Sequence, residues 1–138
     1  MYSWIVGRAL RMLFNRLQAG DVRFIMRTYA PDARLVFPGD SSFAGDHRGK
    51  DEIEAWIERF AGLGPRFVIH DVAVAGPPWH MRVLFRFTDH IPIPGGGQYQ
   101  NEGMELIRIH WGKVREQFVY VDTQKVAEFD AQLDLAAA

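Results

Sequence analysis

The 138-residue chain contains no cysteine, which excludes disulfide bonds and thiolate-bound metal ions and fits a reducing compartment. Its formal net charge of -1 provides no overall attraction to nucleic acid or to an anionic membrane. No apolar run reaches the roughly 20 residues of a membrane span. Arg8 and Arg11 lie inside the apolar start, where a secretory signal would not have them. We therefore expect a cytoplasmic protein with neither nucleic-acid nor membrane partners.

The composition that remains is typical of one folded domain. Hydrophobic residues make up 48% of the chain, charged residues 24% and aromatic residues 13%. A chain of this length can bury a core without cross-links. Because no repeat or linker interrupts it, we predict a single domain over residues 1–138.

Helical spacing of apolar residues dominates the first part of the chain. It predicts a helix over about residues 3–19 that ends at Gly20. Asp21 is a candidate N-cap for a short second helix, which carries Tyr29 and ends before Pro31. A strand over 34–38 and a loop follow. Acidic residues at 51–54 favour the start of a third helix, which ends near Gly62.

In the second half of the chain, apolar and polar residues alternate with a period of two. This alternation predicts strands at 67–74, 79–88, 98–110 and 113–121. A C-terminal helix begins after Asp122 or Thr123. Helices followed by antiparallel strands indicate the α+β class. We expect a cone-shaped, curved antiparallel sheet wrapped around the N-terminal helices, with an apolar pocket at its open end.

Four local segments are characteristic: Ala19-Gly20-Asp21, Tyr29-Ala30-Pro31-Asp32-Ala33, Gly49-Lys50-Asp51-Glu52-Ile53, and Gly112-Lys113-Val114 leading to Tyr120-Val121-Asp122. With these segments, the chain resembles the nuclear transport factor 2-like superfamily, with its cystatin-like α+β barrel, over about residues 5–130. It looks most like the SnoaL-like polyketide cyclases, with ketosteroid isomerase and limonene-epoxide hydrolase as relatives. The resemblance implies a small-molecule pocket, no cofactor and a homodimer.

The catalytic positions implied by this resemblance are mostly apolar here. The general base of the isomerase matches Phe37, its oxyanion-hole tyrosine matches Leu13, and its second oxyanion-hole acid matches Glu105. The last-strand aspartate of the epoxide hydrolase matches Val119. The Arg-x-Asp motif of that enzyme aligns near Arg86-Phe87-Thr88, so Asp89 stands one position too late to match its aspartate. Neither relative's mechanism is therefore expected to operate unchanged.

Glu105 is the candidate catalytic residue. Strand alternation puts it on one face with Asn101 and Ile107. If that face is concave, burial raises the pKa of Glu105 and suits it to proton transfer near neutral pH. The alternative is a carboxylate paired with an arginine of a neighbouring strand. The residues expected to bind ligand are Leu13, Leu17, Tyr29, Phe37, Trp56, Phe60, His70, Phe85, Asn101, Gln117 and Val119.

Two groups of charged residues leave alternatives open. The alternation favours Arg82 and Arg86 outside the pocket, opposite Glu102 and Glu116, although a bulge would turn an arginine inward. Asp89 and the neighbouring His90 are either groups at the cavity mouth or solvated turn residues. The histidines lack metal-ligand spacing, so no metal site is expected.

Three functions are consistent with these observations. The first is a cofactor-independent isomerase, cyclase or hydrolase that acts on an apolar substrate through one pocket carboxylate. The second is a non-catalytic binder of an apolar ligand, and the third is a protein-interaction module. The convex sheet face is also partly apolar, which predicts a homodimer through that face. Its apolar residues are Leu84, Met104, Leu106, Phe118 and Tyr120.

Overall fold

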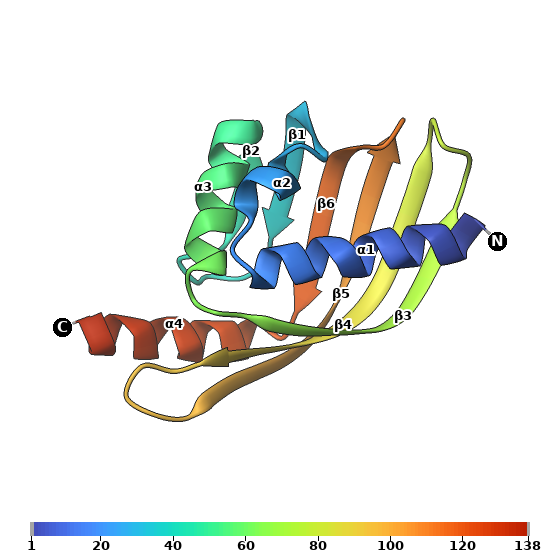
Figure 1. Cartoon of the computed structure of the whole chain (residues 1–138). Coiled ribbons are helices and arrows are strands. Elements are labelled where there is room, and N and C mark those ends of the chain that lie inside the picture. Colours follow the sequence, from blue (N-terminus) through green and yellow to red (C-terminus); the bar gives the residue numbers. More distant parts are fainter. Residues whose placement is uncertain (1, 138) are drawn as a thin grey trace.

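Six strands form one curved sheet in the order β2-β1-β6-β5-β4-β3, and helix α1 crosses its concave side (Figure 1). The computed structural model describes residues 2–137. The helices are α1 (Tyr2–Gln18), α2 (Val22–Met26), α3 (Lys50–Ala61) and α4 (Thr123–Ala137). The strands are β1 (Tyr29–Phe37), β2 (Gly45–Arg48), β3 (Arg66–Ala75), β4 (Met81–Pro92), β5 (Gln98–His110) and β6 (Lys113–Val121). The predicted α+β class and curved sheet are confirmed. Within residues 2–137, no helix is long and apolar enough to cross a bilayer.

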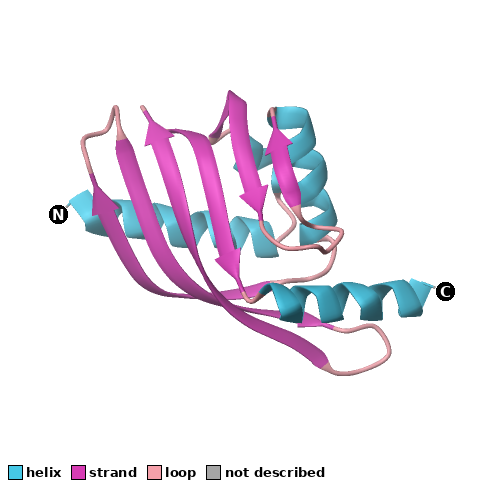
Figure 2. Cartoon of the chain, turned by 180° about the vertical axis from the view of Figure 1, so that it is seen from behind, coloured by secondary structure: helices cyan, strands magenta, loops and turns pink. Residues whose placement is uncertain are grey.

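One strand pairing departs from the predicted antiparallel sheet. β1 runs parallel to β6, with Leu35 opposite Gln117, while the other four pairings are antiparallel. Parallel neighbours need a long connection, and here the whole segment from β2 to β5 lies between β1 and β6. The back view in Figure 2 shows β1 inserted between the hairpin strand β2 and the last strand.

The second helix is shorter at its C-terminal end than predicted. α2 ends at Met26, and Tyr29 already begins β1. Pro31 lies inside that strand, at a register shift in the pairing with β6 between Tyr29 and Arg34. A proline has no N–H to donate, so it is tolerated where the ladder is interrupted. The sequence interpretation also missed β2, whose residues had been predicted as loop.

The hairpin between β4 and β5 begins later than predicted. β4 continues to Pro92, opposite Gln98. Asp89 and His90 are therefore strand residues, and Asp89 is only 5% exposed. The interpretation of both as solvated turn residues was wrong for Asp89. Backbone pairing with β3 on one side and β5 on the other keeps β4 extended beyond its predicted end at residue 88.

The predicted helix signals at the N-terminal end are confirmed. Gly20 has φ 77°, and the N–H of Asp21 donates to the carbonyl of Arg16 at 2.9 Å. This is the arrangement of a helix C-terminus closed by a left-handed glycine. Asp21 Oδ1 then accepts a hydrogen bond from the N–H of Phe24 at 3.3 Å, so it caps α2.

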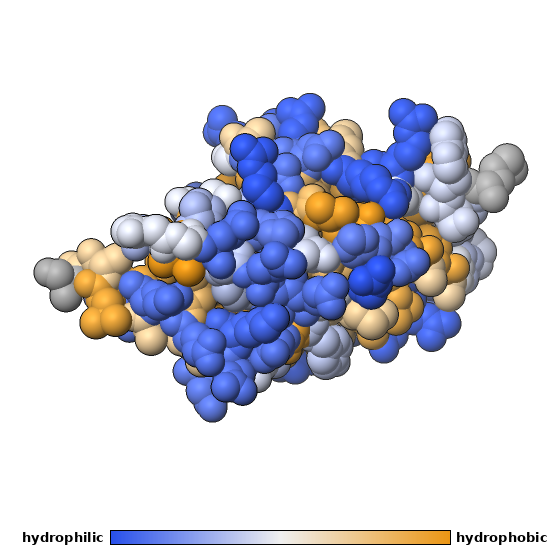
Figure 3. Space-filling view, turned by 90° about the horizontal axis from the view of Figure 1, so that it is seen from below, coloured by the Kyte–Doolittle hydropathy of each residue, from blue (hydrophilic) through white to orange (hydrophobic). Residues whose placement is uncertain are grey.

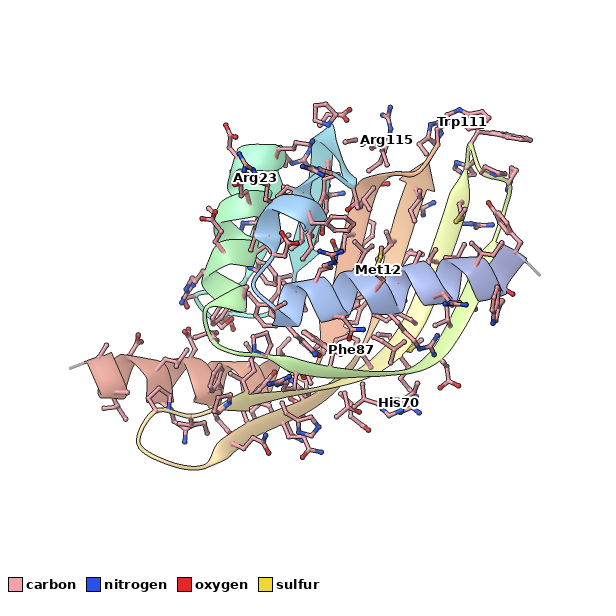
Figure 4. The ribbon with its side chains drawn as sticks, in the orientation of Figure 1. Met12, Arg23, His70, Phe87, Trp111 and Arg115 are labelled. Atoms are coloured by element: carbon pink, nitrogen blue, oxygen red, sulfur yellow. The ribbon has the colours of Figure 1, made fainter. Side chains whose placement is uncertain are left out.

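Two groups of apolar side chains fill the concave side. Under α1, the Phe14 ring packs edge-on against Phe67 at 4.7 Å and against Phe85 at 5.5 Å between ring centroids. Figure 4 shows Phe87 in the same layer, between α1 and the strands. A second group, which we name the α4 cluster, lies beneath the C-terminal helix and contains Phe43, Ile91, Tyr99, Val126 and Phe129.

The far end of α4 extends beyond this packing. Figure 3 shows apolar side chains at the C-terminal end of the helix, where Leu135 is 77% exposed. The first turns of α4 are anchored differently, since Val126 and Phe129 are buried. Asp122 Oδ1 accepts hydrogen bonds from the N–H groups of Gln124 and Lys125, which identifies Asp122 as the N-cap.

Gly103 provides a test of how tightly the concave layer is packed. A methyl group added there would lie 2.6 Å from the carbonyl oxygen of Tyr120 and 2.7 Å from Cζ of Phe87. Gly103→Ala should lower the free energy of unfolding by about 1–3 kcal/mol, because backbone cannot move aside as a flexible side chain can. Urea titration of both proteins measures the change.

Gly7→Ala is the matched control. A methyl group at Gly7 would meet only the end of the Arg11 side chain, at 3.3 Å. Alanine is favoured over glycine inside a helix by roughly 0.5–1 kcal/mol, so this variant should be as stable as the parent or more so. Equal effects of the two substitutions would contradict the tight packing at Gly103.

Candidate functional site

A cavity of about 110 Å³ lies between α1, α3 and the concave face of the sheet; we name it the main chamber. Several side chains in its wall are only partly buried, among them Leu13, Phe37 and Phe60, so the chamber reaches solvent. The wall is apolar except at a few positions. It consists of Leu10, Leu13, Phe14, Leu17, Ile25, Thr28, Tyr29, Leu35, Phe37, Trp56, Ile57, Phe60, Phe67, Glu105, Ile107, Val114, Gln117 and Val119.

Glu105 supplies the carboxyl group of this wall. It stands on β5 opposite Phe85 of β4 and Val119 of β6, and its exposed fraction is 6%. Burial raises the pKa of Glu105 from its ordinary value of 4.5 to about 7, because an apolar surrounding disfavours the charged form. The hydrogen bond from Gln117 opposes this rise, and the charge of Asp89 adds to it.

A chain of two hydrogen bonds holds the Glu105 carboxyl group. Gln117 Nε2 donates to Glu105 Oε1 at 2.6 Å, which occupies one of the two carboxyl oxygens. The Tyr29 hydroxyl in turn donates to Gln117 Oε1. Burial, and then the charge of Glu105, raise the pKa of Tyr29, so this phenol remains a donor. The amide thus has a fixed orientation, with its N–H directed at the carboxyl group.

Aromatic rings form the wall of the main chamber on the α3 side. Trp56 stacks on Phe60 at 5.3 Å between ring centroids and lies 5.5 Å from Phe37. Its indole N–H donates to the carbonyl oxygen of Phe43 at 2.9 Å, which satisfies the one polar atom of the ring. Trp56 therefore has a defined position and can form a wall of a ligand site.

A second, smaller cavity of about 30 Å³ adjoins the first, and we name it the side chamber. The two chambers share Phe37, Trp56, Phe60 and Val119, so these side chains are the partition between them. Asp89 lies in the wall of the side chamber. Burial raises the pKa of Asp89 to about 7.

The structure places nine of the twelve predicted site residues in the wall of the main chamber and three elsewhere. Phe85 is fully buried behind Phe14 and does not reach the main chamber. Asn101 is also buried, and its amide donates to the Tyr99 hydroxyl and the Asp122 carbonyl instead. The nine wall residues are Leu13, Leu17, Tyr29, Phe37, Trp56, Phe60, Glu105, Gln117 and Val119.

His70, which was expected to bind ligand, does not line the main chamber. It lies at a register shift of β3 between Ile69 and Asp71, and it is exposed. Its Nε2 is 2.7 Å from the Thr88 hydroxyl. Figure 4 shows the side chain on the outer side of the sheet, away from α1. Phe67 and Ile69 pack against the core, so alternation along the first part of β3 places His70 on the outer side. The register shift after Ile69 then brings Val72 inward.

The strand arginines lie outside the main chamber. Arg82 is exposed, and Arg86 forms ion pairs with Asp71 at 3.0 Å and with Glu102 at 3.8 Å. The expected pairing with Glu116 was wrong. That residue instead approaches Arg34 and Arg108, because β6 lies beside β1 and β5 rather than beside β4.

Sequence reasoning missed Asp89 as a buried group, although a signal was present. Phe85, Phe87, Asp89 and Ile91 alternate along β4, and all four are buried on the concave face. Had the alternation been extended past residue 88, it would have placed Asp89 inside. Within residues 2–137, no cluster of three or more potential metal ligands occurs.

The fold and the chamber define a class of protein, cone-shaped α+β domains whose curved sheet encloses an apolar space. Solved structures with this fold superpose on the chain. An NTF2-like protein of unknown function from Burkholderia pseudomallei is 17% identical, with a TM-score of 0.77 over 89% of this chain and 95% of that chain. RV0760c from Mycobacterium tuberculosis, in complex with estradiol-17beta-hemisuccinate, is 16% identical, with a TM-score of 0.74 over 89% and 95%. TerC, co-crystallized with polyporic acid, is 18% identical, with a TM-score of 0.75 over 90% and 96%.

At such identities the likeness shows the fold alone. The family assignment comes from the sequence, because the SnoaL-like domain matches residues 10–117. The chain therefore belongs to the SnoaL-like domain family, and the resemblance noted from its local segments is confirmed. No curated protein matches the chain.

The two buried carboxyl groups predict how stability depends on pH. Between its ordinary value of 4.5 and about 7, Glu105 stays protonated in the folded protein but loses its proton in the unfolded chain. Stability should therefore fall as pH rises through this window, and Asp89 acts in the same direction. Glu105→Gln should remove about 2 kcal/mol of the loss between pH 5 and pH 8, as measured by urea denaturation at each pH.

Glu58→Gln is the control for this experiment. Glu58 lies on α3, and its side chain is exposed to solvent. That variant should keep the pH dependence of the parent protein. Parallel stability profiles for the parent and Glu105→Gln would show that the Glu105 carboxyl group is not desolvated in the folded state.

Proposed function

We propose that the protein binds an apolar small molecule in the main chamber and transfers a proton to or from its carbon skeleton without a cofactor. The observation that supports this most directly is Glu105, a buried carboxyl group in an apolar wall, held by Gln117. Relatives of the same fold were crystallised with estradiol-17beta-hemisuccinate and with polyporic acid, which supports an apolar ligand.

Glu105 has the properties of a general base in this proposal. A pKa of about 7 leaves part of the population ionised at neutral pH, while the base is stronger than an ordinary carboxylate. The ionised group would take a proton from a carbon next to a carbonyl group and return it to another position of the same ligand. The electron pair of the broken C–H bond moves toward the carbonyl oxygen during the first step and returns in the second.

Gln117 and Tyr29 are positioning residues for this step. The amide of Gln117 holds one carboxyl oxygen, and the Tyr29 hydroxyl fixes the amide in turn. A base whose orientation is set before the ligand arrives loses little entropy in the reaction. The apolar walls exclude most water, so the ligand does not compete with solvent for the carboxylate.

A specific observation also favours a second function, binding without catalysis. Two positions implied by the ketosteroid isomerase resemblance, the general base and the oxyanion-hole tyrosine, are Phe37 and Leu13, and both stand in the chamber wall. With these apolar side chains the chamber has fewer groups that could stabilise developing charge. An interaction module is less well supported, because about 110 Å³ of the cone remains unfilled by side chains.

The two functions are distinguished by exchange of carbon-bound hydrogen. 2-Tetralone, an aromatic ketone with exchangeable hydrogens next to its carbonyl, is incubated with the protein in D2O, and the loss of its proton signal is followed by NMR. The parent protein should accelerate the exchange. Glu105→Gln, which keeps the shape of the side chain, should reduce that acceleration by about 10²–10⁴-fold.

Glu58→Gln serves as the control variant, since Glu58 is an exposed residue of α3 outside the chamber wall and should leave the exchange rate unchanged. Equal rates for the parent and Glu105→Gln would remove Glu105 from catalysis. Tight binding of the ketone without any accelerated exchange would favour the binding function.

We further propose that two copies associate through the convex sheet face. Leu84, Met104 and Tyr120 are 39%, 47% and 60% exposed there, and they line an open groove with Leu106. Arg86 and Glu102 also line it, so one face offers apolar side chains beside charges of both signs. An interface of this kind can be self-complementary about a twofold axis.

Sedimentation equilibrium at micromolar concentration should therefore give the mass of a dimer. Met104→Glu should shift the equilibrium to the monomer, because it would bury like charges at the centre of the interface. Glu58→Gln, on α3 and outside the residues that line this groove, is the control. A monomer of the parent protein under these conditions would overturn the proposed dimer.

A further inference from the structure

Asp89 carries an unsatisfied polar atom in the middle of an apolar region. Of the side-chain nitrogen and oxygen atoms buried within residues 2–137, only Asp89 Oδ1 has no hydrogen-bond partner. The residue is 5% exposed, and it lines the side chamber. Leaving such a group without a partner costs free energy, so a structural role alone accounts poorly for an aspartate here.

The walls of the side chamber offer Asp89 little compensation. No lysine, arginine or histidine lines this chamber among the described residues, so the carboxyl group has no ion pair there. Two other wall side chains carry polar atoms, and neither bonds to Asp89 Oδ1. The Tyr99 hydroxyl accepts a hydrogen bond from Asn101 at 2.8 Å, and the Trp56 indole N–H donates to the carbonyl oxygen of Phe43 at 2.9 Å. The remaining wall is aromatic and aliphatic. The carboxyl group is thus available to a molecule that enters the chamber.

The side chamber has room for a small polar group. Its volume of about 30 Å³ would accommodate about two water molecules, at roughly 10–15 Å³ each. A hydroxyl substituent of a larger ligand is no bigger than one water. Such a group can fit without displacing the aromatic walls, while the body of the ligand occupies the main chamber beyond the partition.

The ligand would reach Asp89 from the main chamber. On the outer side, Ser42 ties the loop before β2 to α4 by donating to both carboxyl oxygens of Asp130, each at 2.6 Å. Arg59 of α3 donates to the carbonyl oxygen of Ser42 at 3.0 Å. These bonds hold the loop before β2, which supplies Phe43 to the chamber wall, against α3 and α4. On the inner side the partition consists of side chains, which can change rotamer more easily than backbone can move.

We propose that Asp89 is the recognition group of a second subsite, which binds a hydroxyl group at the far end of a neutral, elongated and largely aromatic ligand. A hydroxyl group suits this site because it can donate to a carboxylate and can also accept from a carboxylic acid. An anionic group would be repelled by the carboxylate, and a buried ammonium group would find no second acceptor. This subsite rests on the proposed function, since it assumes that the main chamber holds the body of the same ligand.

Biphenyl and 4-hydroxybiphenyl are the probes for a calorimetric or fluorescence titration of the full chain. They differ by one hydroxyl group at the end of a rigid aromatic rod. The parent protein should bind 4-hydroxybiphenyl roughly tenfold more tightly than biphenyl, as expected for one hydrogen bond to a buried polar group. Asp89→Leu should abolish this preference and bind biphenyl at least as tightly as the parent does.

Two further variants make the outcome decisive. Asp89→Val is smaller and favours a strand, so it replaces Asp89→Leu if the latter does not fold. Glu105→Gln should keep the preference for 4-hydroxybiphenyl. If Glu105→Gln abolishes the preference and Asp89→Leu does not, the hydroxyl group binds at Glu105 and the Asp89 subsite is refuted.

The remaining outcomes separate this subsite from the proposed function. Equal affinities of the parent protein for the two probes would overturn the subsite and leave an apolar main chamber standing. If neither probe binds, the chamber does not take elongated aromatic ligands, and the subsite falls together with ligand binding in the proposed function. A preference that persists in Asp89→Leu and Asp89→Val overturns the subsite alone.

Discussion

The parallel pairing of β1 with β6 is the interaction on which the rest of the structure depends. It begins where the N–H of Val114 donates to the carbonyl oxygen of Thr28 at 2.7 Å, and it continues with Leu35 opposite Gln117. This pairing brings Tyr29 within reach of Gln117, and it sets Phe37 in the wall of both chambers. Without it, β1 and β2 would not join the sheet formed by β3 to β6.

The curved sheet also explains why two carboxyl groups are buried in the same protein. Glu105 and Asp89 stand on neighbouring central strands and point to the concave side, where α1, α3 and α4 exclude water. Burial raises the pKa of each to about 7, and the charge of Asp89 adds to the rise at Glu105. Such an arrangement costs stability at neutral pH, and groups of this kind gather at functional sites.

Much of the fold could be predicted from local signals. Gly20 and Asp21 marked the end of one helix and the start of the next, and the periods of the later strands gave β5 and β6 with their observed bounds. The prediction failed where tertiary contacts override local preference. Pro31 was taken to end a helix, yet it lies in a strand whose ladder is interrupted at that point. His70 was expected to line the pocket, but it lies at a register shift of β3 and is exposed.

The sequence by itself determined which strand positions share a face, and so it identified Glu105 as a carboxyl group on the apolar side of its strand. Only the tertiary structure decided what surrounds it. The hydroxyl of Tyr29 and the amide of Gln117 are 88 residues apart in the chain, and no local pattern joins them. The burial of Asp89 likewise depends on aromatic side chains from α3, α4 and the loop before β2. The desolvation of a charged group is set by everything packed around it, and only the assembled fold defines that environment.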